Sequence, residues 1–481
     1  MHRVPIMALL IALATPAGAD TGKGYEAYQK EDYKTAVQEF RTAALAGDAL
    51  AQFYLGECFY NGRGVPQDFA EGIRWYQKSA EQGQVAAQET LGGIYFSGKG
   101  VARDNALAAK YYRAAADQGK SYPAFVVGYL YDRGDGVPQD PATAAKYYRI
   151  AAEQGNPDAQ EALGALYFSG RGVSQDYTQA AKWYRMVAEA DRVYPQYIVG
   201  WMYENGRGVD ADAAQAATWY RKAAQQGDAR AQASLGFLLY QGKGVPQDQV
   251  EAVKWFRKAA EQKETSAYAS LAWAYYQGKG VAKDDAAAAG WFRKAAENAD
   301  VQAMYMLGFM HDEGRGIEKN GVEAARWYRQ AADAGSRDAM ESLGAMYFFG
   351  RGVDQNFAEA AKWYRQPAEQ GSTYAQFVLG YLYEGGKGVA QDYSAAARWY
   401  RLAADKGDPR AQSQLGWLYY EGKGVEKDLV NAYLWSNLAA AQLAGDERDR
   451  VEKVRDFIAS KMKPDQLAHA QKLARDWKPK Q

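Results

Sequence analysis

The stretch Ala231–Gln262, AQASLGFLLYQGKGVPQDQVEAVKWFRKAAEQ, decides the fold of this 481-residue chain. It reads as a short helix, a glycine-hinged loop and a second helix. The same phrase starts again every 36 residues, at Ala51, Ala87, Ala159, Ala267, Ala303, Ala339, Ala375 and Ala411, and with a leading proline at Pro123 and Pro195. These eleven copies follow one another without insertion or deletion, and such a period is the signature of stacked repeats. We predict an all-α fold, an α/α superhelical solenoid of 36-residue helix-loop-helix repeats.

The recurring residues of this phrase each have a structural reason. Leu235 fills the core side of the first helix, and Gly236 lets the partner helix approach closely. Gly242 and Gly244 bracket a basic residue, and we expect both at positive φ because the loop is sharp. Asp248 is placed to cap the second helix, where its carboxylate can accept hydrogen bonds from free backbone amides.

Three residues depart from the phrase in a way that affects local structure. Pro367 falls inside a second helix, and we expect it to kink or end that helix. Asp191 and Lys263 replace the glycine that follows the second helix in most copies. We expect these two turns to differ in shape from the others.

The N-terminus reads MHRVPIMALLIALATPAGAD, a short basic start followed by an apolar run and a small-residue cleavage signal at Ala17–Ala19. This pattern is typical of a secretory signal peptide, and its apolar run is too short to span a bilayer. We therefore expect a protein exported across the inner membrane, with the periplasm as its location. No membrane span is expected elsewhere.

The repeat boundaries divide the chain into four parts. We assign 1–19 to the signal peptide, 20–50 to an N-terminal capping tetratricopeptide-like unit, 51–446 to the eleven repeats and 447–481 to a C-terminal helical cap. In this last part we expect two helices separated by Pro464, with Asp465 as the N-cap of the second. Trp477 is expected to pack back onto the stack.

Composition excludes several classes of function. Lys plus Arg equals Asp plus Glu at 58 each, and no run of five like charges occurs, so we expect no nucleic-acid partner and no anionic membrane surface. Cys58 is the single cysteine, which excludes a disulfide within the chain and a multi-cysteine metal site. We expect no cofactor and no metal.

The repeat resembles the Sel-one-like repeat, a subclass of the tetratricopeptide superfamily. One copy shows the match at Leu163–Gly164, Gly170–Val173, Asp176 and Trp183–Tyr184. The resemblance implies an α/α superhelix that acts as a protein-binding adaptor, often in bacterial envelope signalling or assembly. Some cysteine-rich relatives are associated with penicillin binding or β-lactamase activity. Those relatives carry a cysteine pair in each repeat, which this chain lacks.

A search for catalytic residues finds little. Beyond the signal peptide the only histidines are His311 and His469. His311 stands in a column otherwise filled by tyrosines such as Tyr167, Tyr203 and Tyr347, so a structural substitution is favoured over a ligand. His469 has no second histidine or cysteine at metal-ligand spacing. No nucleophile-elbow, Ser-x-x-Lys or phosphate-loop motif occurs, and we predict a protein that is not an enzyme.

The residues that vary between copies are where a repeat scaffold carries its function. Counted from the leucine of the Leu-Gly pair, the positions five before, two before, two after and five after form one stripe of the first helix. By resemblance to tetratricopeptide repeats, this stripe lines the concave face. In four copies it carries aromatic residues closed by an acid: Tyr122, Phe125, Tyr129, Asp132; Tyr194, Tyr197, Trp201, Glu204; Tyr305, Phe309, Asp312; and Tyr374, Phe377, Tyr381, Glu384. The copies before three of these carry another set: Glu89 and Phe96, Glu161 and Phe168, Glu341 and Phe348.

Two interpretations of the stripe remain open. Aromatic residues dominate binding hot spots, and a carboxylate could select a basic group of a partner. Alternatively, aromatic and small residues alternate only to fill a tightly wound stack. The recurring acids favour binding.

The sequence thus predicts an exported scaffold that binds an envelope protein or an extended peptide on its concave face. The alternatives are a cell-wall-acting or β-lactam-interacting enzyme, and an architectural protein that binds through its convex side. The identity of the partner and the oligomeric state stay open.

Overall fold

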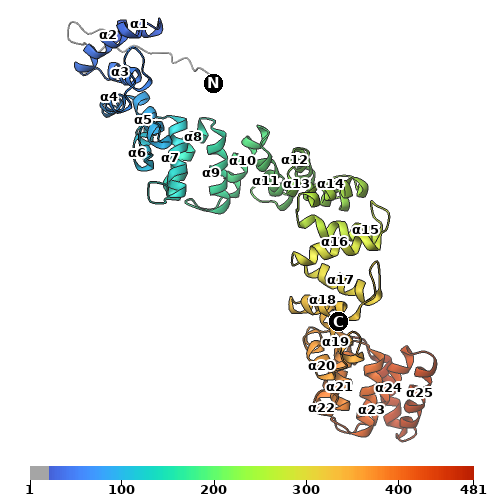
Figure 1. Ribbon diagram of the computed structural model, residues 1–481. Coiled ribbons are helices and arrows are strands. Elements are labelled where there is room, and N and C mark those ends of the chain that lie inside the picture. Colours follow the sequence, from blue (N-terminus) through green and yellow to red (C-terminus); the bar gives the residue numbers. More distant parts are fainter. Residues whose placement is uncertain (1–20, 481) are drawn as a thin grey trace. The chain divides into compact units, whose positions relative to one another are not determined.

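A computed structural model describes residues 21–480, and within that range the chain is all-helical, with 26 helices and no strand (Figure 1). The expected signal peptide lies outside the described residues. The helices are α1 (Thr21–Gln29), α2 (Tyr33–Leu45), α3 (Ala49–Asn61), α4 (Phe69–Glu81), α5 (Val85–Ser97), α6 (Asn105–Asp117), α7 (Ser121–Arg133), α8 (Pro141–Glu153), α9 (Pro157–Ser169), α10 (Tyr177–Glu189), α11 (Val193–Asn205), α12 (Ala213–Gln225), α13 (Ala229–Gln241), α14 (Gln249–Glu261), α15 (Ser266–Gln277), α16 (Asp285–Glu297), α17 (Val301–Glu313), α18 (Gly321–Asp333), α19 (Arg337–Phe349), α20 (Phe357–Glu369), α21 (Thr373–Gly385), α22 (Tyr393–Asp405), α23 (Pro409–Glu421), α24 (Leu429–Gln442), α25 (Gly445–Ala459) and α26 (Pro464–Asp476).

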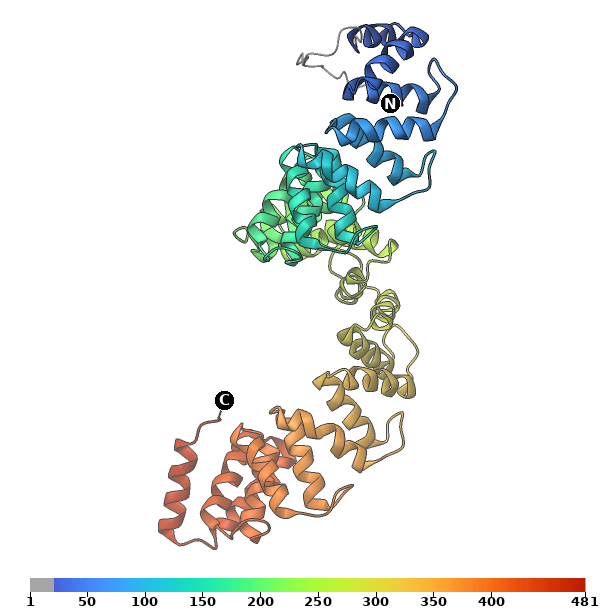
Figure 2. The same ribbon diagram turned by 90° about the vertical axis from the view of Figure 1, so that its left-hand side faces the viewer.

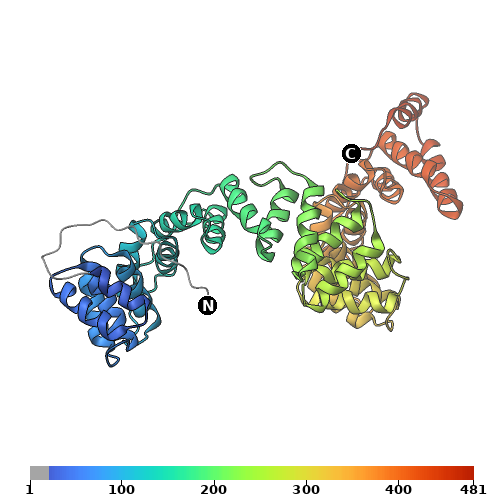
Figure 3. The ribbon, with the colours of Figure 1, turned by 90° about the horizontal axis from the view of Figure 1, so that it is seen from above.

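The helices pack in chain order within two compact units. The first unit runs up to Leu238 and includes Gly242–Pro246, and the second comprises Leu239–Gln241 and Gln247 onward. Inside each unit, helices that follow one another in the sequence lie side by side, so the ribbon colours also follow one another (Figures 2 and 3). From α3 to α24, odd-numbered helices are the first helices of the repeats and even-numbered helices are the second helices. The solenoid predicted from the 36-residue period is confirmed.

The close approach expected at the Leu-Gly pair is present in most repeats. In these repeats the second aromatic residue of the second helix packs against this glycine, whereas Ser436 lies against Gly416. A Cβ added at Gly200 would lie 2.7 Å from Tyr220 Cδ1, and one added at Gly380 would lie 2.5 Å from Tyr400 Cδ1. Real Cβ atoms do not approach so closely, so a side chain here would push the two helices of the repeat apart.

The loop and cap predictions are also confirmed. Gly242 and Gly244 have φ values of 71° and 72°, in the left-handed region that glycine enters without steric cost. The Asp248 carboxylate accepts a 2.8 Å hydrogen bond from the Glu251 amide at the start of α14. The same type of cap begins the other second helices of the repeats, with asparagine replacing aspartate before α18 and α20.

A column of buried glutamines, which recur next to the leading residue of the phrase, ties neighbouring repeats together. The Gln160 amide donates to the carbonyl of Ala152 at 3.1 Å, and Gln196 donates in the same way to Ala188 at 3.2 Å. Gln226, at the end of α12, donates from its side-chain amide to the side-chain oxygen of Gln196 on α11 at 3.0 Å. A buried amide is stable only when it is hydrogen-bonded, so this column helps to fix the register between repeats.

Two local expectations need correction. Pro367 does not end its helix, because α20 continues to Glu369 and spans 13 residues like its neighbours. Asp191 and Lys263 do not avoid the conformation of the glycines they replace: their φ values are 67° and 64°, and Ala299 adopts 65° at the same position. The tight stacking of repeats imposes the left-handed turn on these residues. The helices that follow both residues, α11 and α15, begin without a side-chain cap, and α15 after Lys263 also begins one residue late, at Ser266.

The ends of the stack are helical as well. At the N-terminal end, α1 and α2 form a short pair joined by a tight turn. At the C-terminal end Pro464 is the first residue of α26 and Lys463 precedes it as the N-cap, so the expectation that Asp465 is the cap was wrong. The Trp477 ring meets that of Trp435 edge-on at 6.2 Å between centroids, as expected. No helix within residues 21–480 is long and apolar enough to cross a membrane.

Candidate functional site

The predicted stripe residues lie on first helices of both units. The first unit carries two sets, on α7 and α11, and the second carries two, on α17 and α21. The leading tyrosines are the most accessible: Tyr122 is 58% exposed, Tyr194 41% and Tyr374 36%. The other stripe residues are half-buried. The sets on α7, α11 and α21 therefore each present one exposed ring and a partly covered row behind it, whereas the set on α17 has no exposed ring.

The row behind the exposed tyrosines packs onto the second helices. The Phe125 ring lies 6.0 Å from that of Tyr148, and the Tyr197 ring lies 5.8 Å from that of Tyr220. In the second unit, equivalent contacts join Tyr305 to Tyr328 at 5.7 Å and Phe377 to Tyr400 at 5.9 Å. These stripe aromatics contribute to the core and also reach the surface, so the packing and binding interpretations both describe part of the stripe.

The four acids that close the stripe have partners inside the chain. Glu204 accepts a 2.6 Å hydrogen bond from the buried Tyr220 hydroxyl, and Glu384 accepts one of 2.7 Å from Tyr400. Arg171, from the loop of the next repeat, forms an ion pair with Asp132 at 2.7 Å, and Arg351 approaches Asp312 at 3.9 Å. These carboxylates have a structural role that their spacing along one helix does not reveal. Their part in binding stays a prediction.

A hollow of about 330 Å³ lies among the first helices of the first unit. Its walls come from aromatic residues of α7 and α11, and its floor comes from α9, where Ala165 leaves room between the larger neighbours. The lining residues are Phe125, Tyr129, Tyr148, Asp158, Glu161, Ala162, Ala165, Tyr184, Arg192 and Tyr194. The hollow thus combines aromatic faces with two carboxylates, on a repeat of the type that carries Glu161 and Phe168.

Arg192 spans the two acids of this hollow. Its guanidinium lies 2.7 Å from the Asp158 carboxylate and 3.3 Å from that of Glu161. Both contacts raise the pKa of Arg192, and the hydrogen bond to Asp158 is the strongest influence. The sequence pattern identifies Glu161 as part of an alternating repeat type but does not place it in a site. The residue that sequence reasoning missed is Arg192, which lies in the turn before α11, the first helix of the next repeat.

Two arginines of the chain itself lie on the stripe aromatics. The Arg230 guanidinium lies over the Tyr197 ring at 4.5 Å and near the Tyr194 ring at 5.3 Å. In the second unit, Arg410 lies over Phe377 at 4.6 Å and near Tyr374 at 5.5 Å. Each arginine also bonds the aspartate two residues before it, at 3.0 Å and 2.8 Å respectively. The stripe can therefore hold a guanidinium between aromatic faces and a carboxylate.

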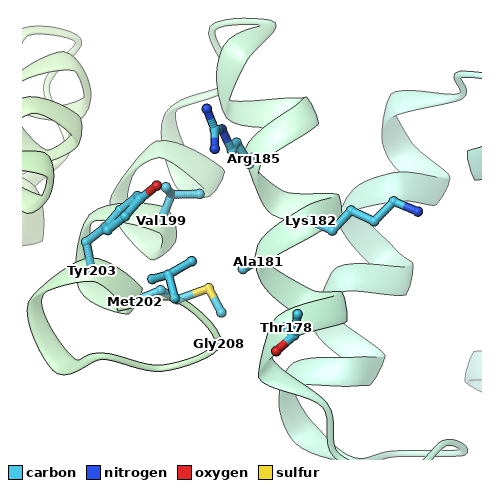
Figure 4. A pocket seen from close by; sticks show the side chains of 9 residues that line it. Thr178, Ala181, Lys182, Arg185, Val199, Met202, Tyr203 and Gly208 are labelled. Atoms are coloured by element: carbon cyan, nitrogen blue, oxygen red, sulfur yellow. The ribbon is translucent and has the colours of Figure 1, made fainter. Parts of the chain in front are cut away.

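A second hollow is a feature of the repeat frame. It measures about 170 Å³ and lies between α10, α11 and the following loop, where Val199 and Met202 form its apolar side and Lys182 points away from Tyr203 (Figure 4). A similar hollow recurs one repeat later around Thr218 and Val245. Recurrence at the same register shows that the loop geometry creates these hollows.

The described residues give no support to the enzymatic alternative. His311 is buried in the tyrosine column, as the structural interpretation predicts, and desolvation lowers its pKa. Cys58 is buried and free, and burial raises the pKa of its thiol to about 12. Within residues 21–480, no three histidine, cysteine or acidic side chains are grouped so that they could hold a metal ion.

The repeats match a known family along most of the chain. A family model described as the Sel1 repeat matches residues 49–84, 85–120, 124–156, 157–191, 196–228, 229–264, 265–300, 301–336, 337–372, 373–408 and 409–442. The chain belongs to the Sel1 repeat family. This is a helical scaffold fold that generally mediates protein–protein interaction.

Solved structures include clear relatives. The chain is 36% identical to c5321, a protective antigen present in uropathogenic Escherichia coli strains that displays an SLR fold; the match has a TM-score of 0.66 and covers 92% of this chain and 94% of that one. It is 30% identical to a Sel1 repeat protein from Oxalobacter formigenes, with a TM-score of 0.46, covering 70% of this chain and 98% of that one. A search of curated proteins gives no match.

Proposed function

We propose that this protein is an exported, non-enzymatic scaffold of the cell envelope that binds an envelope protein or an extended peptide along its first-helix stripe. The observation that carries the proposal is the row of exposed tyrosines, Tyr122, Tyr194 and Tyr374, each next to half-buried aromatic residues. Large rings held in place by a rigid frame provide contact area at a low entropic cost. They are the residues that dominate interface hot spots.

Two observations support export to the envelope. The first twenty residues have the composition of a secretory signal. The related c5321 is described as a protective antigen present in uropathogenic Escherichia coli strains. A periplasmic or surface-facing position of this chain fits both observations.

The proposal is tested by affinity capture with the purified chain from an extract of its native cell envelope, followed by mass spectrometry. Replacing Tyr194 and Tyr374 by alanine removes two exposed rings of the stripe. We expect this double variant to lose the partners that the parent chain captures. Circular dichroism should stay native, because both rings already face solvent over a third or more of their surface.

A matched control removes apolar surface elsewhere. Met186 on α10 and Leu402 on α22 are 44% and 46% exposed and lie on second helices. Their replacement by alanine should leave capture unchanged. Capture that survives the tyrosine substitutions but disappears with Met186 and Leu402 would move the binding face to the second helices and refute the proposal.

A further inference from the structure

The residues that line the acid-and-aromatic hollow of the first unit have counterparts in the second unit, five repeats further along the chain. The residues at matching repeat positions are Phe125 and Tyr305, Tyr129 and Phe309, Tyr148 and Tyr328, Asp158 and Asp338, Glu161 and Glu341, Ala162 and Ser342, Ala165 and Ala345, Tyr184 and Tyr364, Arg192 and Ser372, and Tyr194 and Tyr374. Aromatic residues match aromatic residues, and acids match acids. The one change of charge is at Arg192 and Ser372.

This change alters what the two acids contact. Arg192 neutralises Asp158 and Glu161 in the first unit. In the second unit the Ser372 hydroxyl accepts a 3.2 Å hydrogen bond from the Ala375 amide and caps α21. The nearest arginine that reaches Asp338 is its chain neighbour Arg337, at 4.0 Å, and both side chains are more than half exposed. An ion pair of this kind contributes little.

Aromatic side chains surround the acids of the second unit. Burial raises the pKa of Tyr305, and the negative charges of Asp338 and Glu341 raise it further, so the two carboxylates lie close to this ring. The Tyr374 ring meets that of Tyr364 edge-on at 5.9 Å. The Tyr364 side chain is fully buried, and its hydroxyl has no hydrogen-bond partner of normal geometry. The site is therefore negative and lined by rings, and it retains unused hydrogen-bonding capacity.

The chain itself shows which chemistry fits such a place. Arg192 provides a guanidinium to the matching acids of the first unit. Arg230 and Arg410 lie over the rings of neighbouring stripe positions while an aspartate holds their other side. A cation is attracted both to a carboxylate and to the face of an aromatic ring. Charge complementarity therefore points to a basic side chain as the occupant.

We propose that the second-unit cluster of Asp338, Glu341 and their neighbouring rings is a receptor for an arginine or lysine side chain of an extended partner peptide. In the first unit, Arg192 occupies the matching position and keeps that hollow closed to a second such side chain. This inference rests on the proposed scaffold function and specifies the chemistry of the partner segment.

The test uses the full chain and a fluorescein-labelled decapeptide of alternating arginine and alanine. Its twin carries citrulline, a neutral analogue of the same shape, in place of each arginine. Fluorescence anisotropy should show the arginine peptide binding at least about tenfold more tightly than the citrulline peptide. Glu341→Gln should weaken binding of the arginine peptide by about tenfold or more. Glu369→Gln, which removes one exposed charge at the end of α20, is the matched control and should have no effect.

Exchanging the residues that distinguish the first-unit hollow from its second-unit counterpart gives the sharper test. Ser372→Arg should place an arginine beside Asp338 and Glu341 and abolish peptide binding. The first unit shows that a helix folds normally with arginine at this position, since α11 begins after Arg192 without a side-chain cap. Arg192→Ser should open the first hollow and raise the number of peptides bound per chain from one to two, measured by calorimetry.

Several outcomes would overturn the inference. They are equal binding of the citrulline peptide, unchanged binding by Ser372→Arg, and complete displacement of the peptide by spermidine at equal concentration, which would make a small polyamine the occupant. If these occur while the Tyr194 and Tyr374 substitutions still abolish envelope capture, the scaffold function stands and only the receptor for a basic side chain fails. If capture also survives those substitutions, the proposed function fails too.

Discussion

The Tyr400 hydroxyl donates a 2.7 Å hydrogen bond to the carboxylate of Glu384, and the Tyr400 ring at the same time covers Gly380. Tyr220 and Glu204 have the same relationship in the first unit, at 2.6 Å. A single tyrosine therefore closes the contact between the two helices of a repeat and holds an acid of the stripe. The same tyrosine side chain thus contacts both the recurring glycine of the repeat frame and the variable acid of the stripe.

Alkaline pH should unfold the chain through these tyrosines. Burial raises the pKa of Tyr400 and Tyr220 well above the usual value, and the neighbouring glutamates raise it further. Because the folded pKa exceeds that of the unfolded chain, about 10, this stabilisation is complete below pH 10 and is lost as pH rises above it. Circular dichroism and tyrosine absorbance at 295 nm, recorded together from pH 8 to 12.5, should show these tyrosines ionising as helix is lost. Their ionisation in a still-folded chain would contradict the prediction.

A pair of glycine substitutions should have opposite effects on stability. Gly380→Ala would place a Cβ 2.5 Å from the Tyr400 ring, and such overpacking costs about 1–3 kcal/mol. Gly290 is exposed within α16, and a Cβ added there would meet nothing within 4 Å. Gly290→Ala should therefore stabilise the chain by about 0.5–1 kcal/mol, the helix propensity difference. Urea midpoints measured by circular dichroism should move down for the first variant and up for the second.

Ala299 should be a site where glycine is stabilising. Its φ of 65° is in the left-handed region, which costs a residue with a Cβ about 1–2 kcal/mol. Ala299→Gly should relieve this strain, and we expect a gain of about 0.5–1 kcal/mol after the added freedom of the unfolded chain is counted. Gly335→Ala, at the matching position with φ of 94°, is the reverse experiment and should destabilise. Equal stability of both variants and the parent would show that the turn relaxes.

Acid pH should weaken the second unit through His311. Desolvation lowers the pKa of this buried side chain below its usual 6.5, although Glu323 acts in the opposite direction. The folded pKa lies below that of the unfolded chain, so this stabilisation is present above pH 6.5 and is lost as pH falls below it. His311→Tyr should flatten the dependence of the urea midpoint between pH 7.5 and 5. It should also allow Arg293 to donate to the new hydroxyl, as Arg329 does to Tyr347. A parent chain with a flat profile over this range would refute the explanation.

The fold was predictable because its determinants repeat. When a glycine, an aspartate or a tryptophan recurs at one register in copy after copy, its structural role can be predicted without knowing its neighbours in each copy. The turns at Asp191 and Lys263 were harder, because the stack imposes a backbone conformation that the single residue disfavours. Pro367 does not end its helix because it lies in the last turn of α20, where the loss of one amide donor does not stop the helix, and the alternative of a kink stays a prediction.

The site was predictable only in part. Spacing along one helix placed the stripe residues together, but it says nothing of side chains that arrive from other helices. Tyr220 reaches Glu204 from the second helix of the same repeat, and Arg192 reaches Glu161 from a turn 31 residues later. These contacts show that the acids at the end of the stripe have partners within the chain. They also show that another pair of acids, Asp158 and Glu161, lines the hollow.

The alternation of repeat types has a consequence for how such a chain can change over generations. Loss of one 36-residue copy would leave the frame intact but would bring two aromatic repeats, or two acid-bearing repeats, next to each other. Loss or gain of two copies together would preserve both the frame and the hollow between unlike neighbours. Gene duplication in steps of 72 residues would thus multiply the recognition surface.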